Sequence, residues 1–299
     1  MLRFFDRDQI DAVLDLRGLI DAMEKALIAF SSQKVIQPVR MRIVDPIAGG
    51  DICLMPAVTD VFAVKIVGNY PANHARGLDS HNAVIVVFDR MTGIAQAVLD
   101  GTYITQMRTA SVSAMAARRL SSPDAKVLAI MGSGAQARGH YKTMRLVRDF
   151  EEVRIWSRSL EHAEAFAAEI GAVAMSAEAA VRGADVIATT TSAVEPILRG
   201  DWLKPGVHIS AVGWNGTAGR ELDDAVMQNL ILVESREAAA KESGNIIVSG
   251  TEIYAELGDV LTGRVDVDAA CTTVFISVGI ATEDAYAASL VLPKLLATD

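Results

Sequence analysis

A glycine-rich turn in the middle of the 299-residue chain has the spacing of a dinucleotide site. The stretch KVLAIMGSGAQARGH, residues 126–140, ends an apolar run with Gly132 and Gly134 and places Ala137 at the third small position. Glycine permits a tight turn and close approach to a pyrophosphate, which the N–H groups and dipole of a following helix attract. Glycine loops at strand ends are also common as purely structural turns. Because this turn follows an apolar strand and opens a helix, the pattern favours nucleotide binding.

The next predicted strand, residues 153–158, indicates which dinucleotide would bind. An acidic residue at its end would hold the ribose 2′-hydroxyl of NAD, whereas a small hydroxyl followed by arginine suits the 2′-phosphate of NADP. Ser157 and Arg158 stand at this place, so NADP(H) is favoured over NAD(H); the alternative is a solvated surface arginine. The predicted cofactor contacts within this part of the chain are Gly132, Ser133, Gly134, Ala135, Gln136, Ala137, Ser157, Arg158, Thr190 and Val212.

A second group of residues could bind a carboxylate. An α-amino or α-imino acid needs cationic donors, preferably an arginine fork, on rigid elements. Lys65 interrupts an otherwise apolar strand, FAVKIV, and Arg108 precedes a helix of small residues. Because unpaired charges in apolar surroundings are costly, both favour a functional role over surface ion pairing. Arg40 and Arg42 lie two apart on a predicted strand and share a face; we expect one of them to contact substrate and the other to form a surface ion pair.

The sequence gives weaker evidence for a functional histidine and none for a metal site. His81 follows Ser80 at the start of a strand, where it could orient a substrate, supply a proton or simply cap the strand end. The five histidines are scattered, and no group of His, Cys, Asp and Glu has the spacing of metal ligands. We therefore expect no metal.

The elements that must position these residues change character along the chain. Apolar residues at helical spacing between Leu16 and Phe30 predict an amphipathic helix near the start. Residues 105–120, rich in alanine, predict a connecting helix. Between these helices a mostly antiparallel sheet is predicted from β-type runs at 38–43, 52–55, 62–67 and 83–88.

From residue 126 onward, short strands alternate with helices, and the helix after the glycine turn is expected to run to about Phe150. This alternation predicts a parallel sheet with right-handed crossovers. The fold class is therefore α/β: a Rossmann-type doubly wound parallel sheet plus an α+β domain.

Composition restricts the partners. With 28 Lys and Arg against 37 Asp and Glu, the net charge of -9 disfavours nucleic acid and anionic membranes, so small molecules are the expected ligands. Two separated cysteines, Cys53 and Cys271, do not make a disulfide framework and fit a reducing compartment. Asp6 and Asp8 lie where a signal peptide would be apolar, which predicts a cytoplasmic protein.

Several motifs, in order along nearly the whole chain, resemble those of the ornithine cyclodeaminase/μ-crystallin family. The family includes cyclodeaminases, ketimine and pyrroline-carboxylate reductases, amino-acid dehydrogenases, hydroxyproline dehydratases and a hormone-binding crystallin. The resemblance is therefore much more specific for the family than for one activity. The motifs are PVR at 38–40, LMP at 54–56, VKIVGNYPANHARGLDSH at 64–81, VVFDRMTG, QMRTASVSA at 106–114, MGSGAQA, HISAVGWNGTAGRELD at 208–223 and TVFISVGIATEDAYAA near the C-terminus.

The resemblance implies that the first domain binds substrate and forms a homodimer, and that the last helix returns to this domain. We accordingly predict a substrate-binding and dimerisation domain of residues 1–118 with 279–299, and a Rossmann dinucleotide-binding domain of residues 119–278.

The resemblance also implies individual roles. It places Lys65 and Arg108 at the substrate carboxylate and Thr109 near the cofactor phosphates. Arg40 matches the arginine of the family's PVR motif, although a shift of two residues would favour Arg42. The pair formed by Ser80 and His81 resembles the Ser-His of the μ-crystallin branch.

One departure from the family bears on the reaction. Its cyclodeaminases typically carry an acidic residue followed by Pro-Gly-Lys between AVG and EL, whereas this chain has WNGTAGR at 214–220. Asn215 stands in place of the acid, and an amide is no general base. This favours NAD(P)H-dependent reduction of a small α-imino acid, of ketimine or pyrroline-2-carboxylate type, to the L-amino acid. The predicted catalytic residues are Lys65, His81, Arg108 and Asn215.

The alternatives are ornithine cyclodeaminase activity, hydroxyproline dehydratase activity, and non-catalytic binding of NADPH with a small ligand.

Overall fold

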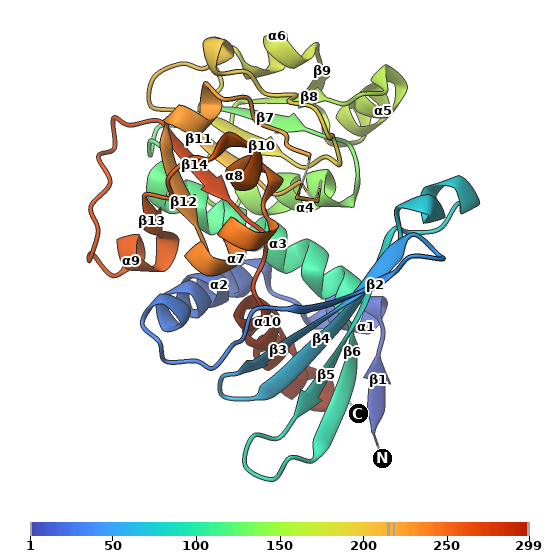
Figure 1. Cartoon of the computed structure of the whole chain (residues 1–299). Coiled ribbons are helices and arrows are strands. Elements are labelled where there is room, and N and C mark those ends of the chain that lie inside the picture. Colours follow the sequence, from blue (N-terminus) through green and yellow to red (C-terminus); the bar gives the residue numbers. More distant parts are fainter. Residues whose placement is uncertain (1, 214–215, 218, 298–299) are drawn as a thin grey trace. The chain divides into compact units, whose positions relative to one another are not determined.

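The computed structural model describes residues 2–213, 216–217 and 219–297, and the chain divides into two compact units (Figure 1). Unit 1 comprises Met1–Arg108 and Ile280–Asp299, and unit 2 comprises Thr109–Gly279. The first boundary falls inside the long helix α3 (Gly101–Leu120). Within the described ranges, no helix is both long and apolar enough to cross a bilayer.

Unit 1 contains a sheet whose strands β2 to β6 pair antiparallel, while β1 adds to its edge in parallel with β6. The predicted, mostly antiparallel sheet is therefore confirmed. Two strands lie outside the predicted runs: β1 has only 3 residues, and β6, AQAVLD, has few β-branched residues. The strand order across the sheet is β1 (Arg3–Phe5), β6 (Ala95–Asp100), β5 (His81–Phe88), β4 (Phe62–Asn69), β3 (Gly50–Val58) and β2 (Met41–Asp45).

Helices cover one face of this sheet. Figure 1 shows α2 (Leu16–Ser31, blue) and α10 (Ala281–Ala297, dark red) on the same side, and α10 contacts α2, β3, β4 and β5. Asp15 caps α2 by accepting bonds from two backbone N–H groups of its first turn, and the predicted apolar stripe is buried. The two smaller elements of the unit are α1 (Arg7–Val13) and the 3-10 helix η1 (Pro71–Arg76).

Unit 2 is built around a parallel sheet, which confirms the predicted Rossmann-type fold. Every described pair in it is parallel, and the sequence order of the strands reverses between β7 and β10. Ligands of such sheets bind outside the carboxyl ends of the strands at the reversal point. The order is β13 (Ala255–Glu256), β12 (Leu230–Val233), β14 (Thr273–Ile276), β11 (His208–Ala211), β10 (Val186–Thr189), β7 (Val127–Met131), β8 (Glu152–Trp156) and β9 (Val173–Ala174).

Both faces of the parallel sheet are buried. Ala129 and Met131 of β7 join one core cluster with residues of α6, α7 and α8, while Leu128 and Ile130, on the opposite face, are also fully buried. This is the pattern of a doubly wound sheet. The remaining helices of unit 2 are α4 (Ala135–Met144), α5 (Leu160–Ile170), α6 (Ala177–Val181), η2 (Gly200–Trp202), η3 (Val226–Gln228), α7 (Arg236–Glu242), α8 (Gly244–Ser249) and α9 (Leu257–Leu261).

Helix α4 ends at Met144 and not near Phe150, where the sequence predicted its end. The N–H groups of Leu146 and Val147 bond to the carbonyls of Thr143 and Met144. These bonds span three residues, so the chain tightens and leaves the α-helical path.

Candidate active site

The glycine turn lies at the carboxyl end of β7. Gly132 has a φ of 140°, which favours glycine, and a Cβ there would lie 2.2 Å from Thr190 Oγ1. Gly134 is the extended N-cap of α4 and forms no side-chain capping bond. A Cβ on Gly134 would meet no described heavy atom within 4 Å. An uncovered helix N-terminus beside a turn that only glycine can form fits the pyrophosphate of a dinucleotide.

Two further predicted cofactor residues lie at this edge of the sheet. Thr190 directly follows β10 and donates its N–H and its hydroxyl to the carbonyl of Met131, at 2.9 and 3.2 Å. Val212 follows β11, and its N–H donates to the carbonyl of Thr189. The structure therefore brings Thr190 against the glycine turn and places Val212 one strand further along the same edge.

Thr109 is buried on α3, whose second half packs on α4. The hydroxyl of Thr143 donates to the carbonyl of Ala110 at 2.9 Å, and His140 Nε2 lies 3.0 Å from Ser113 Oγ. Burial lowers the pKa of His140 to about 4, so this imidazole is neutral near pH 7. These bonds fasten α3 to the helix that follows the glycine turn.

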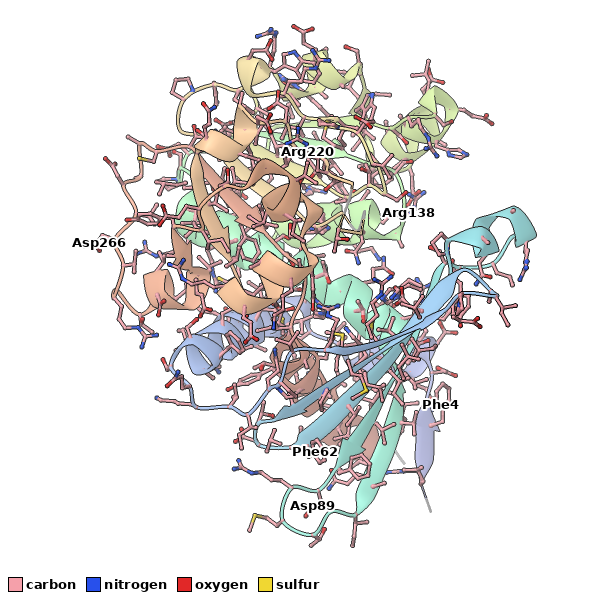
Figure 2. The ribbon with its side chains drawn as sticks, in the orientation of Figure 1. Phe4, Phe62, Asp89, Arg138, Arg220 and Asp266 are labelled. Carbon is pink, nitrogen blue, oxygen red and sulfur yellow. The ribbon has the colours of Figure 1, made fainter. Side chains whose placement is uncertain are left out.

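Serine and arginine side chains surround the end of β8. Ser133 Oγ of the glycine turn donates to Ser157 Oγ at 2.9 Å, and Arg158 beside it is exposed. A second arginine, which the sequence analysis did not identify, contacts the turn: Arg138, labelled in Figure 2, donates to the carbonyl of Ser133 at 3.0 Å and to Glu169 at 2.6 Å. The end of β8 therefore carries two hydroxyls and the exposed Arg158, while Arg138 is paired with Glu169.

A buried carboxylate, Glu221, fixes the loops after β10 and β11. It accepts hydrogen bonds from the hydroxyl of Thr189 at 2.7 Å, from the N–H and hydroxyl of Thr191 at 2.7 and 2.6 Å, and from the N–H of Gly213 at 3.0 Å. A Cβ on Gly213 would lie 2.3 Å from the carboxyl carbon, so glycine is required. Burial raises the pKa of Glu221, while the four hydrogen bonds oppose the rise.

In unit 1, Lys65 and Arg108 belong to a cluster of four buried charges. The Lys65 ammonium of β4 lies 2.7 Å from Asp284 Oδ2 of α10. Arg108 of α3 contacts Glu283 Oε2 through Nη1 at 2.7 Å and Asp284 Oδ1 through Nε at 3.0 Å. None of the four side chains is more than 4% exposed. Two cations predicted from separate motifs therefore lie in one site, held by two adjacent acids.

The charges of this cluster shape one another. Burial lowers the pKa of Lys65 to about 8, against the opposing attraction of Asp284, and the nearby charges of Arg108 and Arg40 lower it further. Burial would raise the pKa of Asp284, but Lys65 and Arg108 hold it below its usual value. The carboxylate is therefore ionised near pH 7, and Lys65 is mostly protonated.

His81 lies on the same face of the sheet as Lys65, because it pairs with Asn69, which is four residues along β4 from Lys65. Burial, followed by the charges of Lys65 and Arg108, lowers the pKa of His81 to about 4. The imidazole is thus neutral near pH 7, where it can orient a ligand by hydrogen bonding.

The two arginines of the PVR region differ in environment. Arg42 donates to Asp51 at 2.7 Å, and Asp51 also accepts from Asn69 at 2.9 Å. Burial opposes ionisation of Asp51, yet Arg42 and Asn69 hold its pKa below the ordinary value. Arg40 influences the charge of Lys65. Arg42 thus pairs with a carboxylate on the next strand, and the positive charge of Arg40 lowers the pKa of Lys65.

The predicted residue Asn215 lies outside the described residues. Sequence reasoning missed Glu221, Glu283 and Asp284 as individual residues. A signal was present for the last two, since adjacent acids within an otherwise apolar helix require buried partners.

A doubly wound parallel sheet with a glycine turn at its reversal point is the architecture of dinucleotide-binding α/β proteins, and the other unit contains a buried cluster of two cations and two acids. The model of the ornithine cyclodeaminase/mu-crystallin family matches residues 4–299. This chain belongs to that family, as the motifs indicated.

Several relatives and solved structures are similar over nearly their whole length. A ketimine reductase mu-crystallin of Macropus fuliginosus is 46% identical over 286 residues, covering 91% of this chain and 90% of the relative. The structure of Thermococcus litoralis Delta(1)-pyrroline-2-carboxylate reductase, in complex with NADH and L-proline, has a TM-score of 0.95 and 32% identity, covering 100% of this chain and 98% of the other. An archaeal alanine dehydrogenase dimer with bound NAD has a TM-score of 0.94 and 27% identity, covering 99% and 97%.

Proposed function

We propose that this protein is an NAD(P)H-dependent reductase of small α-imino acids, of ketimine or pyrroline-2-carboxylate type, and forms the L-amino acid. The observation that carries the proposal is the buried cluster in which Lys65 and Arg108 are held together by Asp284. The relatives named ketimine reductase and pyrroline-2-carboxylate reductase support the same reaction.

The cluster is suited to binding one carboxylate. Its two cations, Lys65 and Arg108, are both buried, and the positive charge of Arg40 also acts on Lys65. Ammonium and guanidinium groups form charge-assisted hydrogen bonds with carboxylates, and such bonds are stronger where water is excluded, so the carboxylate of an imino acid would bind well to these two cations. Arginine can contact a carboxylate through two parallel N–H bonds, which would also fix the orientation of the acid.

The glycine turn and the residues around it are proposed to hold the cofactor. Gly132 and Gly134 would admit the pyrophosphate to the N-terminus of α4, with Thr190 beside it. Ser157 and Arg158 would contact the 2′-phosphate, so we propose a preference for NADP(H) over NAD(H). A bound reduced nicotinamide supplies hydride.

This reaction requires little acid-base catalysis from the residues of unit 1. An imine that binds as the iminium is already protonated and electrophilic, so no strong base is required. Lys65 and Arg108 hold the carboxylate and thereby fix the α-carbon, and neutral His81 can hydrogen-bond to the ligand. Asn215 is proposed to position the nitrogen by hydrogen bonding, a role open to an amide.

We also propose that the protein is a homodimer formed through unit 1. The sheet face opposite the helices carries half-buried aliphatic residues in cross-strand rows, one of them running through Leu54, Ile66 and Val84. A second row runs through Val64 and Val86. Such a continuous apolar face is typical of a subunit interface. Figure 2 shows Phe62 and Phe4, both partly exposed, on the same sheet.

A cytoplasmic location remains part of the proposal. It is supported by two free cysteines, Cys53 and Cys271, the first of which is buried.

A substrate and cofactor screen tests the function. The purified protein is given NADPH or NADH with pyrroline-2-carboxylate, piperideine-2-carboxylate, or a keto acid plus an amine, and the absorbance of the reduced nicotinamide is followed. We expect cofactor oxidation with at least one imino acid and formation of the L-amino acid. A dehydratase would turn over substrate with no net cofactor oxidation, and a pure binding protein would turn over nothing.

A further inference from the structure

Two adjacent acids, Glu283 and Asp284, lie in the first turn of α10, within the stretch GIATEDAYAASLVL. Their side chains are 0% and 1% exposed. A helix dipole favours acids in a first turn, but this effect operates at the protein surface as well and does not explain their burial. Burying two carboxylates is costly unless cations pair with them. The burial of these two acids must therefore be explained by their contacts with cations and not by the stability of the helix.

The two acids make different contacts. Asp284 bridges both cations: Oδ2 lies 2.7 Å from Lys65 Nζ, and Oδ1 lies 3.0 Å from Arg108 Nε. Glu283 contacts Arg108 through Nη1 at 2.7 Å. In the described part of the chain, the ion pair of Lys65 is formed with Asp284. Asp284 is therefore the carboxylate that couples the ammonium of β4 to the guanidinium of α3.

We propose that Asp284 is a positioning residue of the substrate site: its single carboxylate fixes the Lys65 ammonium and the Arg108 guanidinium in the arrangement that receives the substrate carboxylate. Asp284 acts through these two cations and touches no reacting atom. The inference rests on the proposed function, because it takes the cations to be the substrate's carboxylate ligands.

Electrostatics supports this role. The charged and titratable groups facing Lys65 are Asp284 on α10, Arg108 on α3, Arg40 before β2 and His81 on β5. Among the influences on the pKa of Lys65, burial, Arg108 and Arg40 lower it, while Asp284 raises it. Neutralising Asp284 removes the influence that keeps Lys65 protonated, so Lys65 would lose its proton at a lower pH and bind a carboxylate less well.

The experiment measures kcat/KM against pH. The full-length protein, with NADPH and pyrroline-2-carboxylate, is assayed from about pH 6 to about pH 10, a range chosen to span the titration of Lys65. The variants are Asp284→Asn and, as the matched control, Glu283→Gln, which alters the neighbouring acid on the same helix turn. Because all proteins share one substrate, the titration of the imine itself cancels in the comparison.

For wild type, we expect kcat/KM to fall as the pH rises through about 8. In Asp284→Asn, this alkaline limb should move down by about one pH unit or more, with kcat/KM reduced roughly 30-fold or more and the greater part of the change in KM. Glu283→Gln should lose activity without moving the limb. An Asp284→Asn enzyme with the limb of wild type, or a limb that moves equally in both variants, would overturn the proposal.

Two further measurements decide the remaining cases. If Asp284→Asn does not fold, Asp284→Glu keeps the charge but displaces it: a limb at the wild-type pH with a raised KM supports the proposal, and unchanged kinetics contradict it. If wild type reduces no imine, the proposed function fails, and positioning is decided by titrating pyrrole-2-carboxylate, a carboxylate that cannot be reduced, into each protein across the pH range. We expect the loss of pyrrole-2-carboxylate affinity at alkaline pH to move to lower pH in Asp284→Asn alone. Equal affinities in the three proteins at every pH would overturn the inference.

Discussion

Lys65 and Asp284 form a buried ion pair, with 2.7 Å between Nζ and Oδ2, although one residue lies in β4 and the other in the last helix of the chain. The pair links the sheet of unit 1 to α10 and sets the charge of the lysine. A cation and an acid that are each costly to bury alone stabilise each other. Arg108 lies beside this pair, with its Nε 3.0 Å from Asp284 Oδ1.

Cofactor preference is tested at Arg158. Replacing Arg158 by alanine removes a charge-assisted contact to the 2′-phosphate, so the dissociation constant of NADPH should rise by the equivalent of about 1 to 3 kcal/mol, while that of NADH stays nearly unchanged. Equilibrium fluorescence titration measures both. The matched control is Arg182→Ala, because Arg182 is an exposed arginine paired with Glu178 elsewhere in unit 2. Equal rises in the dissociation constants of NADPH and NADH would show that Arg158 does not contact the 2′-phosphate.

Assembly is tested at the apolar sheet face. Light scattering should give about twice the chain mass of 31.9 kDa. A charge placed among the aliphatic rows, Val64→Glu, should shift the mass toward that of one chain, because an unpaired carboxylate would be buried in the interface. Met91→Glu, at an 89% exposed position, should leave the dimer intact. A wild-type monomer at micromolar concentration would contradict the proposed interface.

Acid stability depends on the buried imidazoles of His140 and His208 and on the half-buried imidazole of His81. Burial lowers the pKa of His81 and His140 to about 4 and that of His208 to about 3. Between about pH 6.5 and about pH 4 the unfolded chain binds protons at these residues and the folded protein does not, so stability falls as the pH falls through this range. Thermal melts across the range should show the decline, and His140→Gln should make it shallower. If the dependence of stability on pH is unchanged in His140→Gln, the folded protein also protonates His140 within this pH range.

Removing Glu221 should loosen the edge that carries Thr190 and Val212. Glu221→Ala leaves the donors of Thr189, Thr191 and Gly213 without their acceptor, and we expect a loss of roughly 3 kcal/mol in unfolding free energy together with weaker cofactor binding. Denaturant unfolding and NADPH titration measure the two effects. Glu195→Ala, at an exposed position, is the control and should change neither.

Much of the fold follows from local sequence patterns. Apolar strands that alternate with helices predict the parallel sheet, and the helix Leu160–Ile170 follows from its serine cap and terminal glycine. The three-residue strand β1 and the strand β6, which has few β-branched residues, are not predicted in this way, because their pairing is decided by the neighbouring strands and not by propensity.

The candidate site was predictable in its cations but not in its geometry. Lys65 is conspicuous because it interrupts an apolar strand, and Arg108 is recognised through its motif. That both share Asp284 depends on α10 returning to the sheet, and no local pattern encodes this long-range contact. The choice between Arg40 and Arg42 likewise depends on Asp51, which becomes a neighbour of Arg42 only when β2 pairs with β3.

Asn215 separates reduction from cyclodeamination. Cyclodeamination requires proton removal from an amine and loss of ammonia, steps that a carboxylate can assist and an amide cannot. We expect no appreciable conversion of ornithine to proline, and Asn215→Ala should slow imine reduction by less than the roughly 10²- to 10⁴-fold typical of a lost acid-base residue. Amino-acid analysis after incubation with ornithine and NAD is the measurement. Proline and ammonia formed with catalytic NAD would refute the assignment.

In the proposed reaction, Arg108 and its buried partners bind the carboxylate of an imino acid that is then reduced. The most direct measurement of this role is the steady-state kcat/KM for NADPH-dependent reduction of pyrroline-2-carboxylate by wild type, Arg108→Ala and Arg119→Ala, the last replacing an exposed arginine of the same helix. We expect reduction by wild type, a loss of roughly 10²-fold or more in Arg108→Ala, and near-normal activity in Arg119→Ala. Full activity in a folded Arg108→Ala enzyme would contradict it.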